Sequence, residues 1–229
     1  MIPVAAYATI PNLVILPDVA IASKGAVRSI LLVSTKPIDE IRSVALDSSS
    51  RSSAALIQIL FAKYWRQEVR YVSAEPDLIR MLSICDAALL IGDPALQVDR
   101  SRYVTWDLGE EWRAFTGKPF VFAFWAARAA CADERELSDA AQVFRESRDQ
   151  GLHHIAEIAA VWAPKLRLSK QEIARYLEGN IHYFLDQENL AGMQLFFRHA
   201  TELGILPPVP ELRIASPTQN RNSTEFARF

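Results

Sequence analysis

Strands and helices alternate along the first half of this chain and helices alone follow, which predicts an α/β fold with a helical C-terminal part. The apolar run at 28–34 has the composition of a strand buried on both faces, and the run at 120–127 is the most hydrophobic strand that we expect. Beyond residue 133 the apolar residues recur with helical spacing instead. Half of the 229 residues are hydrophobic and 23% are charged, which is enough apolar material for a large core.

The first 21 residues are apolar, but they predict loop and strand rather than a targeting or membrane segment. They lack a basic start, contain Asp18, and are interrupted by Pro3, Pro11 and Pro17. A signal peptide and a membrane span both require an uninterrupted apolar stretch. We therefore expect a cytoplasmic protein without a membrane partner.

Most of the following elements are defined by apolar runs and by the turn residues between them. In order, we expect strands at 28–34 (in a parallel sheet) and 43–46, an apolar helix at 54–65, a strand at 69–72, a short helix ending near 83, and strands at 87–91 and 120–127. Asp107, followed by Glu110 and then by Gly117, marks a capped helix before the last strand.

The C-terminal part carries its own helix signals. Ser169 with Glu172 has the spacing of a capping box, and Asp186 and Gly204 mark the start and the end of another helix. Residues 215–229 are polar and show no periodicity, so we expect a disordered tail.

A serine-rich turn between the strand at 43–46 and its helix is the strongest local signal for a binding site. The serines are Ser48, Ser49, Ser50, Ser52 and Ser53. The first amides of a helix lack intrahelical acceptors and lie at the positive end of the helix dipole, so they bind carboxylates or phosphates. One serine would suffice as a plain N-cap, with the others solvated; because there are five, we favour an anion site.

Other candidate residues carry weaker signals. The turn Gly92-Asp93-Pro94 follows a buried strand, where ligands of α/β sheets bind, but it is equally typical of a simple turn. The aromatic residues at 120–125, Trp125 included, either floor a ring pocket or, as is commoner, belong to the core. His153 and His154 lie in an amphipathic stretch and are expected at the surface.

Composition and missing motifs exclude several classes of function. Lys and Arg total 25 against 27 Asp and Glu, so no nucleic-acid partner is expected. Cys85 and Cys131 stand in apolar surroundings without paired spacing, which predicts buried thiols in a reducing compartment. The four histidines show no ligand spacing, so no metal is expected. No Ser-His-Asp order, Walker loop or GxGxxG motif supports a hydrolase, kinase or dehydrogenase.

Four runs of the sequence resemble the chorismate dehydratase family of the futalosine route to menaquinone. In order they are IASKGAVRSILLVS, VALDSSSRSSAAL, DAALLIGDPAL and DLGEEWRAFTGKPFVFAFWAAR. The resemblance covers residues 1 to about 210. It implies a fold like that of a type 2 periplasmic-binding protein, a clamshell of two α/β lobes joined by crossover strands.

The resemblance also implies how the lobes and the site are arranged. Residues 38–116 would form the inserted lobe, and residues 1–37 with 117–229 the other. The serines of the turn would hold a substrate carboxylate, while Ser29 and Asp93 would face the same cleft. Family members carry a further N-terminal strand-helix-strand unit with a cleft asparagine, and this chain begins after it. The expected clamshell is therefore N-terminally incomplete, which would leave unpaired sheet edges.

By the same resemblance, the expected reaction converts chorismate to 3-[(1-carboxyvinyl)oxy]benzoate by loss of water. Aromatisation of the ring drives this loss, and it needs no metal or cofactor. The substrate's own side-chain carboxylate would take the proton, with Asp93 as the alternative base. The chain would act as a monomer or homodimer.

Three alternatives remain open at this level. The first is a non-catalytic solute-binding protein with the same clamshell, and the second is a truncated paralogue without activity. The third is 1,4-dihydroxy-6-naphthoate synthase, which by family resemblance uses a cleft histidine. Neither His153 nor His154 stands in a motif of that kind.

Overall fold

The computed structural model describes residues 1–209 and 211–216. Most of the tail expected to be disordered, from residue 217 onward, lies outside the described residues. Among the helices that are described, none combines the length and the apolarity needed to cross a membrane.

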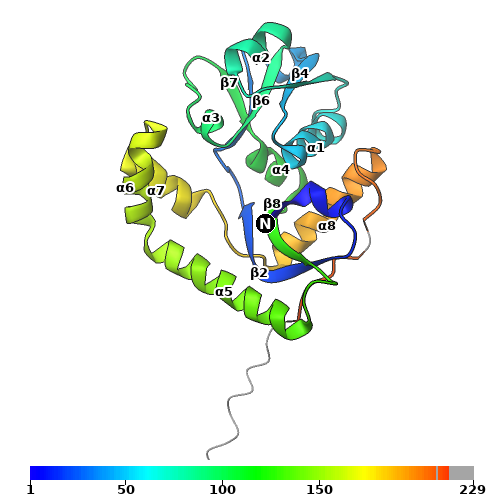
Figure 1. Ribbon diagram of the computed structural model, residues 1–229. Coiled ribbons are helices and arrows are strands. Elements are labelled where there is room, and N and C mark those ends of the chain that lie inside the picture. The colour runs from blue at the N-terminus through cyan, green and yellow to red at the C-terminus, as the bar shows by residue number, and fades with distance from the viewer. Residues whose placement is uncertain (210, 217–229) are drawn as a thin grey trace, which may run out of the picture.

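Two β-sheets organise the chain, one in each half of the molecule (Figure 1). The smaller sheet has the strand order β1 (Ile2–Pro3), β8 (Phe120–Arg128) and β2 (Leu13–Ser23). The larger sheet has the order β5 (Arg70–Ala74), β4 (Ser43–Asp47), β6 (Ala87–Ile91), β3 (Ile30–Ser34) and β7 (Val104–Asp107). The predicted α/β class is confirmed.

The direction and the sheet of β3 differ from the prediction. β3 is buried along its whole length, as expected, but it pairs antiparallel with both β6 and β7. A strand is buried on both faces when other elements cover both sides of its sheet, whatever its direction. The apolar run therefore could not predict whether β3 pairs parallel or antiparallel. The pairing also places β3 in the larger sheet, whereas the sequence assigned residues 1–37 to the other lobe. The chain passes between the sheets before β3, in residues 24–29, which we call the crossover segment.

Helices cover the larger sheet and then form the C-terminal part. Those that pack on or beside the larger sheet are α1 (Arg51–Ile59) with its π-helical continuation η3 (Leu60–Trp65), α2 (Leu78–Ile84), α3 (Asp93–Leu96) and α4 (Leu108–Thr116). The others are α5 (Glu134–His153), α6 (Ile155–Leu166), α7 (Lys170–Gly179) and α8 (Gln187–Glu202). Short 3-10 turns occupy η1 (Val4–Ala8) and η2 (Ile38–Glu40).

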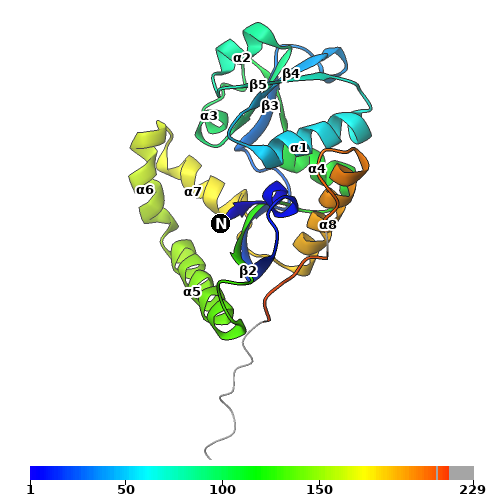
Figure 2. The same ribbon diagram turned by 45° about the vertical axis from the view of Figure 1, so that its right-hand side comes forward.

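The C-terminal helices divide between the smaller sheet and a projecting arm. α5 and α8 pack on β2 and β8, while α6 and α7 pack on each other. In both views α6 and α7 stand beside the end of the larger sheet that carries α3 (Figures 1 and 2). We call this pair the arm. The capping box of Ser169 with Glu172 and the N-cap Asp186 are confirmed.

The carboxylate of Asp107 joins the crossover segment to α4. Its Oδ1 accepts hydrogen bonds from the amides of Val27 (2.9 Å) and Gly109 (3.0 Å), and its Oδ2 accepts one from the amide of Arg28 (2.6 Å). A Cβ atom at Gly109 would lie 2.5 Å from the carbonyl oxygen of Gly25, so only glycine permits this close approach. The predicted helix cap thus also fixes the chain between the two sheets.

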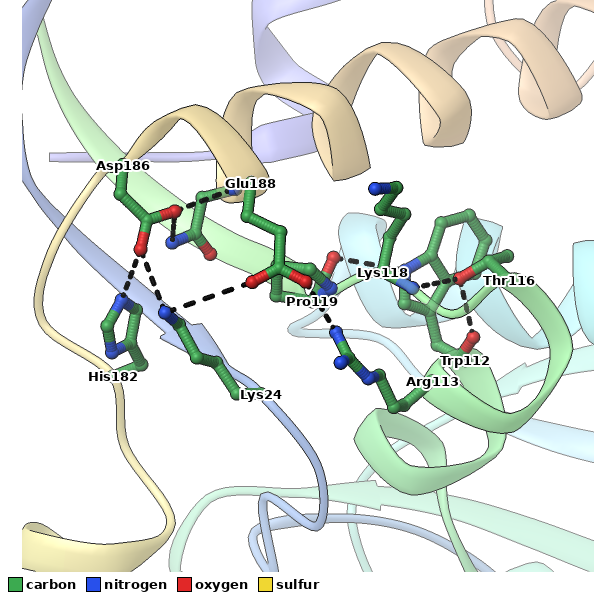
Figure 3. A network of polar contacts seen from close by, with 10 residues as sticks. Lys24, Trp112, Arg113, Thr116, Lys118, Pro119, His182, Asp186 and Glu188 are labelled. Atoms are coloured by element: carbon green, nitrogen blue, oxygen red, sulfur yellow. Dashed lines mark hydrogen bonds and ion pairs between the residues drawn. The ribbon is translucent and has the colours of Figure 1, made fainter.

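One hydrophobic core extends through both halves. Trp112 of α4 packs edge-on against Phe120 of β8, with ring centroids 5.4 Å apart, and its Nε1 donates a hydrogen bond to the carbonyl oxygen of Pro119 (Figure 3). The same cluster includes Val44 from the larger sheet and Phe124 from the smaller one. The halves are therefore packed together on the α4 side.

An ionic network at the start of α8 strengthens this side (Figure 3). Lys24 Nζ lies 2.9 Å from Asp186 Oδ2, and Arg113 Nη1 lies 2.8 Å from Glu188 Oε1. Partial burial alone would raise the pKa of Asp186, but hydrogen bonds from the Lys24 ammonium and from Asn189 lower it to about 2.

Replacing Asp107 by Ala removes one buried acceptor that serves several amides. We expect D107A to lower the free energy of unfolding by about 3 kcal/mol or more, because a lost cap and unpaired buried amides add up. The N-cap Asp77 of α2 is exposed, so D77A is the matched control and should cost about 1 kcal/mol. Urea denaturation compares the two; equal losses would show that the crossover bonds contribute nothing.

The low pKa of Asp186 predicts a loss of stability in acid. Its folded pKa lies below the ordinary value of about 4, so its ion pair stabilises the fold above pH 4 and is lost as the pH falls towards 2. The carboxylate is partly exposed, so the contribution should be below about 1 kcal/mol. Asn also caps helices, hence D186N should show a shallower decline in urea midpoint from pH 5 to pH 2 than the unaltered chain. An identical decline would contradict this assignment.

Candidate functional site

The residues expected in the cleft lie along one edge of the larger sheet. β4 and β6 run parallel, so the turns after Asp47 and after Ile91 emerge at the same edge. β3 runs the other way, and its first residue Ile30 pairs with Ile91, which brings Ser29 to that edge as well. The serine turn, Asp93 and Ser29 therefore follow one another across β4, β6 and β3.

The serine turn (residues 48–53) opens α1, as the sequence suggested, but the helix begins at Arg51 rather than near residue 54. Ser50 is the N-cap, and its Oγ accepts a hydrogen bond from the amide of Ser53 at 3.2 Å. Neither the amide of Arg51 nor that of Ser52 donates a hydrogen bond to any described residue. These two amides and the hydroxyl proton of Ser50 remain available to an anion.

Part of the serine turn is occupied by the protein's own carboxylates. The buried Asp47 accepts hydrogen bonds at Oδ1 from both the amide (2.9 Å) and the hydroxyl (2.6 Å) of Ser49. Ser48 Oγ lies 3.4 Å from Glu75 Oε1. The structure thus separates Ser48 and Ser49, which face carboxylates, from the free donors at residues 50–52.

Ser52 connects the two halves rather than facing open space. Its side chain is buried, and its Oγ accepts a hydrogen bond of 3.1 Å from the amide of Ala5 in η1. Ser53 is buried in the first turn of α1 as well. The start of α1 therefore lies at the junction of the two halves.

Asp93 is the first residue of the short helix α3, and its side chain is exposed. Gly92, before it, has φ of 64° and donates its amide to the carbonyl oxygen of Ser29 at 2.7 Å. Within the described residues the Asp93 carboxylate accepts no hydrogen bond, so it is free to act on a ligand. The predicted tight turn is a single helical turn.

Tyr176 of the arm contacts the same edge, although no local pattern in the sequence singled it out. Its hydroxyl donates a hydrogen bond of 3.0 Å to Ser29 Oγ, and Asn180 Nδ2 donates one of 2.8 Å to the carbonyl oxygen of Ala26. Only the fold brings α7 to the crossover segment, because about 150 residues separate Ser29 from Tyr176. The arm therefore forms one wall of the candidate site.

Two tyrosines near this edge have a pKa above the ordinary value for the residue. Burial raises the pKa of Tyr176, the hydrogen bond to Ser29 lowers it, and the negative charge of Asp93 raises it again, with a net upward shift. Burial also raises the pKa of Tyr183, to about 12. Both hydroxyls are consequently hydrogen-bond donors at neutral pH.

The weaker candidates are assigned to structure or surface. Phe120, Phe122 and Phe124 are buried in the core, and Trp125 packs on Phe144 of α5 at 5.3 Å between ring centroids. His153 and His154 are exposed at the end of α5. Cys85 is buried as expected, but Cys131 is exposed, because it lies in the loop between β8 and α5.

Solved structures of similar shape define the class of protein. A crystal structure of a protein from Archaeoglobus fulgidus matches 90% of this chain and 78% of its own length, with a TM-score of 0.64 and 16% identity. The periplasmic aliphatic sulphonate binding protein SsuA from Escherichia coli matches 99% of this chain and 76% of its own length, with a TM-score of 0.55 and 19% identity. The chain has the two-lobed fold of periplasmic solute-binding proteins, which confirms the predicted clamshell.

Sequence comparison gives the family. The menaquinone biosynthesis family model matches residues 1–202, so the chain belongs to that family. The chorismate dehydratase of Thermus thermophilus is 31% identical over 202 residues, which cover 81% of this chain and 72% of that protein. The family expected from the four sequence runs is confirmed.

The roles of the serines predict different costs of substitution. S52A leaves the buried amide of Ala5 without an acceptor, so we expect the free energy of unfolding to fall by about 1 to 3 kcal/mol. S48A removes an exposed hydroxyl whose contact with Glu75 is 3.4 Å long, and it should change the free energy of unfolding by less than about 0.5 kcal/mol. Urea denaturation of both variants tests this difference, and a neutral S52A would show that the bond between the halves is dispensable.

Proposed function

We propose that this chain dehydrates chorismate to 3-[(1-carboxyvinyl)oxy]benzoate in the futalosine route to menaquinone, in the cytoplasm. The proposal rests on membership of the menaquinone biosynthesis family and on a 31% identical relative named chorismate dehydratase. The structural observation that supports it is the group of free donors at the start of α1, at the junction of the two halves.

The start of α1 would hold a carboxylate of the substrate. The amides of Arg51 and Ser52 and the hydroxyl of Ser50 would donate to its oxygens, and the positive end of the helix dipole adds to the attraction. Ser53 and Ser52 support this turn from within, since both are buried. The predicted role of the five serines is thus divided between binding the ligand and shaping the turn.

The elimination itself requires one base and assistance to one leaving group. A proton leaves the ring carbon that bears the ether, its electron pair forms a new ring double bond, and the ring hydroxyl departs as water. The Asp93 carboxylate is a free base on the cleft edge, and the substrate's own side-chain carboxylate is the alternative. Tyr176 donates its hydroxyl proton to Ser29, so it would have to give up this bond to assist the departing hydroxyl.

A non-catalytic binding role is the second candidate, because the fold is shared with the sulphonate binding protein SsuA. Both functions predict that the chain binds a small carboxylate. Only the enzyme predicts that chorismate loses one water. Incubating the purified chain with chorismate and following the mass of the product therefore separates the two, and intact chorismate with measurable binding would favour the binding protein.

Substitution separates the base from the anion site. We expect D93N to lower kcat by about 100-fold while leaving the Kd for chorismate within about twofold, as for loss of a general base. S50A should instead weaken binding by about tenfold, because it removes a donor to a charged group. S83A, an exposed serine on α2, is the control for both. A D93N variant with full activity would assign the proton to the substrate's carboxylate.

A further inference from the structure

A cleft lies between the arm and the loop that follows α3. Figure 2 shows these two parts of the backbone side by side. Its volume is about 470 Å³, and it is lined by Arg28, residues 96–100, residues 166–168 and Glu172. None of the serines of the turn lines it, nor does Asp93. It adjoins the site that we propose for the substrate, because both include the arm and the crossover segment, but it has its own lining residues. We call it the arginine cleft.

Three arginines from separate parts of the chain line the arginine cleft. Arg28 belongs to the crossover segment, Arg100 to the loop after α3, and Arg167 to the end of α6. Throughout residues 1–209 and 211–216, none of the three forms an ion pair within 4.0 Å. Arg100 Nη2 lies 3.5 Å from the carbonyl oxygen of Arg28, which places two of these guanidinium-bearing residues close together.

The acidic side chains of the cleft are engaged by serines rather than by the arginines. Asp99 Oδ1 accepts hydrogen bonds from the amide and the hydroxyl of Ser101, the latter at 2.6 Å. Glu172 Oε2 accepts the corresponding pair from Ser169, with the hydroxyl at 2.6 Å. The three arginines thus outnumber the two lining carboxylates, and within the described residues none of the three is in an ion pair, although Arg100 donates one long hydrogen bond to the carbonyl oxygen of Arg28.

Two of the three arginines have a backbone conformation that is strained for a residue with a side chain. Arg28 and Arg167 both have left-handed φ values, of 63° and 55°. Glycine adopts this conformation without strain, whereas a residue with a Cβ is strained in it. The backbone would therefore favour glycine at both positions, and what arginine adds is a guanidinium fork, which matches carboxylate and phosphate oxygens.

We propose that the arginine cleft binds a small anion that carries a phosphate or carboxylate group, held by Arg28, Arg100 and Arg167. This is a second binding site, beyond the proposed dehydration of chorismate. Because one wall belongs to the arm and the other to the loop after α3, the bound anion would link these two parts of the molecule.

The test is a calorimetric titration of the purified full chain at constant ionic strength, with inorganic phosphate in one series and succinate in the other. We expect saturable binding of at least one of the two. R167G should weaken it by about tenfold or more, because a hydrogen bond to a charged group is lost. R66G is the matched control: Arg66 also ends a helix with left-handed φ (57°) and is exposed, but it lies outside the cleft. The affinity of the R66G variant for the anion should stay within about twofold of that of the unaltered chain.

Three results would overturn the proposal. The first is that neither phosphate nor succinate binds saturably to the unaltered chain, and the second is that R66G weakens binding as much as R167G, which would indicate a general charge effect. The third is that S50A weakens binding as much as R167G, since the anion would then sit at the serine turn.

R28G provides a second cleft variant, and circular dichroism of each variant shows that it is folded. Loss of chorismate turnover would not affect these titrations, so the two proposals fail separately.

Discussion

The hydrogen bonds that converge on Asp107 are the constraint on which the arrangement of the site depends. One buried carboxylate caps α4 and also fixes the amides of Val27 and Arg28. The crossover segment is thereby held against the larger sheet just before Ser29, so the position of Ser29 relative to Asp93 follows from this junction. Arg28, which has a left-handed φ of 63°, belongs to the same segment.

Much of the local structure was predictable from the sequence because it depends on short-range chemistry. The caps at Asp107, Ser169 and Asp186 follow from side chains that accept bonds from amides two or three residues ahead. The apolar runs gave the strands β3, β6 and β8. They did not give the pairing of β3, because burial is compatible with either direction, and they missed β7, which has four residues and passes at once into α4.

The candidate site was predictable only in part, for a similar reason. The serine turn and Asp93 each follow a strand, so their place at a sheet edge could be inferred from the chain alone. The sequence did not show which serines would be used by the protein itself: Ser49 bonds to Asp47 and Ser52 to Ala5. Tyr176 was missed altogether, because its contact with Ser29 depends on the path of the arm across the molecule.

The core shared by the two sheets has a consequence for how the protein loses its structure. Side chains of β8, α4, α1 and α8 belong to one continuous cluster, with Trp112 and Phe120 at the boundary. Unfolding of one half would therefore remove apolar contacts of the other half. The two halves should unfold together in one cooperative transition. The arm contributes little to this cluster, so local opening of α6 and α7 can occur at a lower energetic cost than global unfolding.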